Sequence, residues 1–164
     1  MIDKKQRRGE LRERTKAYRN KLKEIGEALG LKVRFERGVP GVRTDVLWYY
    51  SFPKGASQFE QEIPIVAFEI EGAWRTEKTI KGDFVNLLLM RPLYGIVLFL
   101  ERGFRIDYGK GFQIEDNLRV ARVMAENFSR FGRFLVWTQK EVDDLYMSLV
   151  NEGLISKTDI PQLG

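Results

Sequence analysis

Acidic side chains end or interrupt two apolar segments that are expected to form neighbouring strands. Asp45 lies in the segment 43–48, and Glu69 and Glu71 close the apolar segment 65–71. Because side chains alternate along a strand, Glu69 and Glu71 point to the same face, about 6.5–7 Å apart. If the strand that carries Asp45 pairs beside them, three carboxylates meet, and their mutual repulsion favours a bound cation. Hard oxygen ligands suit Mg²⁺, with Mn²⁺ as an alternative.

The amino-acid composition excludes several kinds of catalytic site. The chain contains no His and no Cys, so a Ser-His-Asp triad, a thiol nucleophile, a His- or Cys-ligated zinc ion and a disulfide are all excluded. Carboxylates, Lys, Tyr, Ser, Thr and a hard metal ion remain available for catalysis. The charged fraction of 31% and the absence of Cys would also suit a thermophilic source.

Length and hydropathy predict one globular domain over residues 1–164. A chain of 164 residues with 43% apolar side chains can bury a hydrophobic core. No apolar run is long enough to span a membrane, and the first residues are charged rather than apolar. We therefore expect a soluble, cytoplasmic protein with no membrane partner.

Positive charge is concentrated at the start of the chain. Residues 1–24 contain ten Lys and Arg against four Asp and Glu, a net charge of +6, whereas the whole chain has +5 and the remainder is therefore −1. Such a basic end predicts a polyanionic partner, usually nucleic acid. A solvated helix face is the alternative interpretation.

The apolar spacing predicts alternating helices and strands. Leu11, Tyr18, Leu22, Ile25 and Leu29 form one helical stripe within a basic helix over about 4–29. The expected elements after it are strands over 31–36, 42–50 and 63–71, a helix over 77–90, a strand over 94–100, a helix over 114–131, a strand over 134–137, a helix over 138–151 and a loose tail over about 156–164. This order predicts an α/β fold with a mixed sheet of about five strands flanked by helices.

Some residues allow more detailed predictions about the core, one turn and one helix start. Val123 and Phe131 are expected to face the core from the helix over 114–131. Gly38 to Gly41 predict a turn between the first two strands. Thr138 and Glu141 have the spacing of a capping box, which predicts the start of the last helix.

A helix, a strand with Asp45, a strand ending in Glu69-Ile70-Glu71, and then a helix and a strand resemble the restriction-endonuclease-like superfamily of PD-(D/E)XK nucleases. The resemblance covers about residues 18–101. It implies that Asp45 and Glu69 bind the metal, and the Ile70 carbonyl is a plausible further ligand. Glu71 stands at the position where the family usually has Lys, and a minority of restriction-type enzymes of this fold also carry Glu there. Glu71 could complete a second metal site or accept a proton from the attacking water.

The missing Lys has candidate replacements in the following helix. Elsewhere in the superfamily this helix supplies the Lys, which here would be Lys81 or Lys78, with Lys81 preferred because it lies near the apolar edge of the helix. Some members add a Glu from the first helix, for which Glu24 and Glu27 are candidates.

The resemblance implies a Mg²⁺-dependent nuclease that acts on DNA, commonly as a homodimer. The candidate contacts to nucleic acid lie in the basic helix and after the acids, and they are Arg8, Arg12, Lys16, Arg19, Lys23, Arg75 and Lys78. The chief rival is a non-catalytic nucleic-acid-binding or assembly module of the same fold. A third interpretation is that the acids hold a metal for another phosphotransfer reaction. The simplest interpretation of Glu69 and Glu71 is a solvated strand face without function.

Overall fold

The computed structural model describes residues 4–37, 42–56, 62–101 and 114–156. The turn expected at 38–41 and the tail expected after Ser156 lie outside these residues. The elements in order are α1 (Lys4–Ala28), β1 (Lys32–Arg37), β2 (Thr44–Ser51), β3 (Glu62–Glu71), α2 (Glu77–Met90), β4 (Tyr94–Phe99), α4 (Ile114–Phe128), β5 (Phe134–Thr138) and α5 (Gln139–Asn151). The predicted α/β class with a mixed five-stranded sheet between helices is confirmed.

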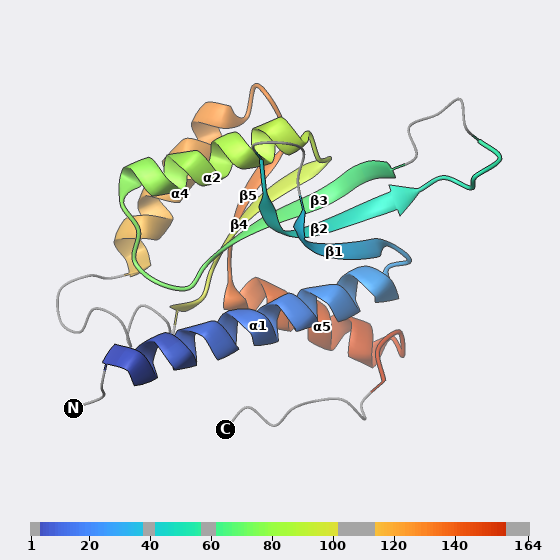
Figure 1. Ribbon diagram of the computed structural model, residues 1–164, viewed down its shortest axis with the longest axis horizontal. Coiled ribbons are helices and arrows are strands. Elements are labelled where there is room, and N and C mark those ends of the chain that lie inside the picture. The colour runs from blue at the N-terminus through green and yellow to red at the C-terminus, as the bar shows by residue number, and fades with distance from the viewer. Residues whose placement is uncertain (1–3, 38–41, 57–61, 102–113, 157–164) are drawn as a thin grey trace.

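The sheet has the strand order β1-β2-β3-β4-β5. Strands β1, β2 and β3 pair antiparallel, whereas β3, β4 and β5 pair parallel. Parallel neighbours need a crossover connection, which α2 provides between β3 and β4. Helices α1 and α5 cover one face of the sheet, and α2 and α4 cover the other (Figure 1).

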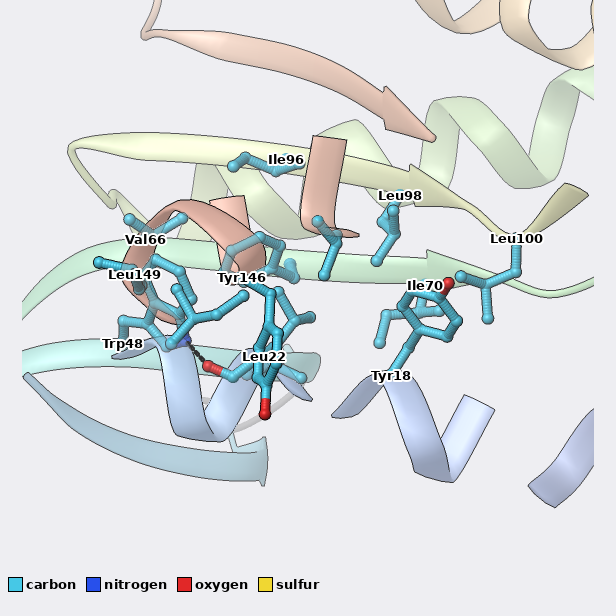
Figure 2. Close-up of a cluster of buried hydrophobic side chains, with 14 of the residues drawn as sticks. Tyr18, Leu22, Trp48, Val66, Ile70, Ile96, Leu98, Leu100, Tyr146 and Leu149 are labelled. Atoms are coloured by element: carbon cyan, nitrogen blue, oxygen red, sulfur yellow. Dashed lines mark hydrogen bonds between the residues drawn. The ribbon is translucent and has the colours of Figure 1, made fainter. Parts of the chain in front are cut away.

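The larger core cluster lies between the sheet and the pair α1–α5. Figure 2 shows Tyr18 and Leu22 of α1 among side chains of the sheet and of α5. The indole Nε1 of Trp48 donates a hydrogen bond to the Leu22 carbonyl at 3.0 Å (Figure 2). A Cβ at Gly26 would lie 2.7 Å from Cγ2 of Val33 and 2.8 Å from the Trp48 indole nitrogen, so only glycine permits this close approach. The approach fixes how α1 crosses the sheet.

Hydrogen bonds and ion pairs hold α1 against α5. The Tyr18 hydroxyl donates to Asp143 at 3.0 Å, and Lys21 lies 2.7 Å from the same carboxylate. The predicted capping box at the start of α5 is confirmed, because Thr138 and Glu141 bond to each other's backbone groups. The position of α1 is therefore determined by contacts with both the sheet and α5.

Helix α4 differs from its prediction at two positions. Val123 and Phe131 were expected in the core, but their exposed fractions are 49% and 62%. Val123 lies two residues after the buried Ala121, which places it about 200° round the helix. Phe131 lies beyond the end of α4 at Phe128, because the predicted helix was three residues too long.

No helix in the described ranges has both the length and the apolar character needed to cross a membrane.

Candidate functional site

Strand pairing places the predicted acids on one face of the sheet. Val46 pairs with Phe68 in the antiparallel register of β2 and β3. Extending that register by one residue places Asp45 opposite Glu69, and opposite residues share a face. Glu71 follows two residues later on the same face, at the end of β3.

A fourth acid joins these three from α2. Asp83 is 8% exposed and lies on the buried side of the helix with Ile80, Phe84 and Leu87. Its charge acts on Glu69, and it forms a hydrogen bond with Glu71. The charge of Asp45 acts on Glu69, Glu71 and Asp83. Asp83 was not among the predicted site residues, although it is a charged residue within the apolar stripe of the helix. We call Asp45, Glu69, Glu71 and Asp83 the acid cluster.

Burial raises the pKa of three members of the acid cluster, Glu69, Glu71 and Asp83. Burial, followed by the charges of Asp45 and Asp83, raises the pKa of Glu69 to about 9. Burial, followed by the charge of Glu71 and a hydrogen bond with it, raises the pKa of Asp83 to about 8. The pKa of Glu71 is also raised, because burial outweighs the opposing effect of Arg75. Protons therefore reduce the repulsion among the acids when no cation is bound.

Two arginines and one backbone amide contact the acid cluster. Nη2 of Arg19 lies 2.6 Å from Oδ1 of Asp45, and the backbone N–H of Ile70 donates to Oδ2 at 2.7 Å. Nε of Arg75 lies 2.5 Å from Oε2 of Glu71. These two cations face four carboxyl groups, so the cluster lacks counter-charge for its fully ionised form.

The chemistry of the acid cluster fits a hard divalent cation. Its four carboxyl groups are the oxygen ligands that Mg²⁺ and Mn²⁺ prefer. Oδ2 of Asp83 is buried and has no hydrogen-bond partner in the structure described. As they stand, no three acidic side chains of the described residues are arranged to hold a metal ion. The side chains engaged by Arg19 and Arg75 would have to turn before three of the acids could share one ion.

The two candidate lysines of α2 lie apart from the acid cluster. Lys78 and Lys81 are both exposed, and neither forms an ion pair with a described residue. Lys81 precedes Asp83 by two residues, about 200° round the helix, so it points away from the sheet. The helix presents Asp83 and Asn86 to the strand acids instead, with Nδ2 of Asn86 3.4 Å from Oε1 of Glu69. The expectation that Lys81 is close to the acids is therefore wrong.

The candidate glutamates of α1 are also engaged elsewhere. Glu24 accepts a hydrogen bond at 2.7 Å from the Tyr146 hydroxyl of α5, and Glu27 lies 3.8 Å from Lys23 on its own helix. The side chain that α1 sends to the acid cluster is Arg19, which also pairs with Glu36 at 3.0 Å.

A cleft of about 630 Å³ opens beside Asp45. Its lining residues are Arg7, Arg8, Leu11, Arg12, Thr15 and Arg19 of α1, with Asp45, Ile70, Gly72, Ala73 and Arg75. In Figure 1, the N-terminal half of α1 lies below the segment that joins β3 to α2, and these two segments form most of the cleft walls. We call this feature the arginine cleft.

The arginine cleft gathers part of the predicted nucleic-acid contacts. Four of the seven predicted residues line it, namely Arg8, Arg12, Arg19 and Arg75. The other three, Lys16, Lys23 and Lys78, are exposed outside it. Arg7 lines the cleft but was not predicted, because a basic helix alone does not show which of its faces meets the rest of the chain.

No protein-family model, no curated protein and no solved structure matches this chain.

Proposed function

We propose that the protein is a metal-dependent nuclease that hydrolyses phosphodiester bonds of DNA, in the manner of the restriction-endonuclease-like superfamily. The observation that carries the proposal is the acid cluster, which opens through Asp45 into the arginine cleft. Metal-dependent hydrolysis of a nucleic-acid phosphodiester needs both a site for a hard cation and a surface that binds a polyanion. These two requirements meet at Asp45.

Residues of the acid cluster would take distinct roles. Asp45 and Glu69 would hold a Mg²⁺ or Mn²⁺ ion, with Asp83 and the Ile70 carbonyl as further ligands. When bound, the ion neutralises charge on the scissile phosphate and lowers the pKa of its bound water. Glu71 would complete the ligand set or accept a proton from the attacking water.

Arg75 is the best candidate for the positive charge that the motif lacks at position 71. Its side chain is 41% exposed, contacts Glu71, and lines the arginine cleft. A guanidinium in that position can donate two hydrogen bonds to one phosphate. We therefore assign phosphate stabilisation to Arg75 rather than to Lys81 or Lys78. The homodimer implied by the resemblance stays a prediction.

A non-catalytic nucleic-acid-binding module is the second candidate. It is favoured by the ion pairs of Asp45 with Arg19 and of Glu71 with Arg75, which already occupy two acids of the cluster. In such a module, the arginine cleft would bind nucleic acid while the acid cluster would serve only to position the two arginines.

The two candidates differ in the metal dependence of cleavage. Labelled single-stranded DNA and duplex DNA are incubated with the protein and Mg²⁺, Mn²⁺ or EDTA, and the products are separated by electrophoresis. We expect cleavage with either metal and none with EDTA. Lys81→Ala should retain the wild-type rate within about twofold, because exposed side chains away from a site contribute little. Salt-sensitive binding without cleavage under all conditions would instead favour the non-catalytic module.

A further inference from the structure

We propose that the arginine cleft takes one single strand of nucleic acid and excludes the duplex. The inference rests on the proposed function, because it names the form of substrate that reaches the acid cluster. Three features of the cleft favour a single strand, namely the arrangement of its arginines, its size, and the close approach of its walls.

The arginines of α1 form a row that leads to the acid cluster. Arg8, Arg12 and Arg19 are four and seven residues apart and line the same cleft, so they share one face of the helix. At 1.5 Å per residue, the row spans about 16 Å along the helix axis. It ends at Arg19, which contacts Asp45. A backbone that follows the row reaches Asp45, the member of the acid cluster that lines the cleft.

Three arginines that line the cleft have their charge available. Arg7, Arg8 and Arg12 form no ion pair with another described residue. Arg19 and Arg75, by contrast, already contact acids of the cluster. Four of the five cleft arginines come from α1, so positive charge lies mainly along one wall. This arrangement matches a single row of phosphates rather than the two rows that a duplex presents.

The size of the cleft favours a single strand over a duplex. The cleft has a volume of about 630 Å³. A B-form duplex is broader than its own major groove, which alone is about 12 Å wide, so we expect a duplex to stay at the mouth of the cleft. The walls also meet closely, because a Cβ on Gly72 would lie 3.3 Å from Oγ1 of Thr15. A single backbone with its unpaired bases remains as the form that fits.

The test measures binding in EDTA, where cleavage does not interfere. A fluorescein-labelled 12-nucleotide strand is titrated by fluorescence anisotropy, alone and in a blunt duplex. We expect the single strand to bind at least about tenfold more tightly. With three free arginines, the plot of log K against log salt should have a slope of about −2, at about 0.7 per phosphate.

Variants of the row give the matched comparison. Arg8→Gln with Arg12→Gln should weaken single-strand binding at least about tenfold and reduce the salt slope by about 1.4. Arg119→Gln with Arg122→Gln removes the same charge from the exposed side of α4 and should leave binding unchanged. Circular dichroism of both variants checks that the helices are retained.

The outcomes separate this inference from the proposed function. Equal affinity for duplex and single strand, or unchanged binding by the Arg8 and Arg12 variant, overturns the inference even if the protein cleaves DNA. Selective single-strand binding through Arg8 and Arg12, without cleavage in any metal, supports the inference while contradicting the nuclease activity.

Discussion

Asp45→Asn and Glu69→Gln are each expected to slow metal-dependent DNA cleavage by about 10³-fold. Each substitution removes a charged oxygen ligand but keeps the size of the side chain. Glu69 is 8% exposed and favours its protonated form, so glutamine should also preserve the fold. The measurement is the single-turnover cleavage rate at saturating Mg²⁺, with the melting temperature of each variant recorded alongside.

Glu62→Gln is the matched control for Glu69→Gln. Glu62 lies on the same strand, and its partner is Arg34 at 2.5 Å rather than a member of the acid cluster. We expect the control to cleave at the wild-type rate within about twofold, as expected for a substitution distant from the site. A folded Asp45→Asn or Glu69→Gln variant that cleaves within tenfold of wild type would rule out the acid cluster as the active site.

Without divalent metal, the folded protein is expected to lose stability as the pH rises from about 5 to 9. The pKa of Glu69 is about 9 and that of Asp83 about 8 in the folded state, and both are raised mainly by burial. Between their unfolded-state and folded-state pKa values, the folded protein keeps protons that the unfolded chain releases, so rising pH favours unfolding. For each proton that only the folded protein keeps, the free energy of unfolding falls by about 1.4 kcal/mol per unit of rising pH.

Thermal unfolding in EDTA at several pH values measures this effect. A loss of about 1.4 kcal/mol corresponds to a fall in melting temperature of several degrees for a chain of this size. The double variant Glu69→Gln with Asp83→Asn should show a much smaller slope, because neither side chain can then lose a proton. Mg²⁺ should raise the wild-type melting temperature more at pH 9 than at pH 6, because it competes with those protons. A wild-type melting temperature that rises over this range would contradict the account.

Strand alternation made three members of the acid cluster predictable. Glu69 and Glu71 share a face because side chains alternate along a strand. Asp45 joins them on that face once its strand pairs antiparallel with theirs in the expected register. The boundaries of α2 were equally accessible, because the apolar spacing indicated a helix over 77–90 and Pro92 lies just beyond its end, as the structure confirms. These features depend on local rules of strand and helix formation.

The contacts of Asp83 and Arg19 with the strand acids depended on tertiary packing that the sequence does not display. Whether Asp83 faces the strand acids depends on how α2 is rotated about its axis when it packs on the sheet. Arg19 contacts Asp45 from α1, and the close packing of this helix at Gly26 against Val33 and Trp48 is likewise a tertiary contact. Lys81 was expected near the acids and Val123 in the core, and both predictions failed for the same reason. The apolar residues of a helix show roughly which side is buried, but not where the buried side ends.

Calorimetric titration of Mg²⁺ into the metal-free protein at pH 7.5 measures whether the acid cluster binds a metal ion. Titrations in buffers of different ionisation enthalpy also count the protons that binding releases. We predict saturable binding that releases protons from Glu69 and Asp83, and affinity at least about tenfold lower in Glu69→Gln. Absence of binding in the wild type, or equal affinity and proton release in Glu69→Gln, would contradict the assignment of the acid cluster as a metal centre.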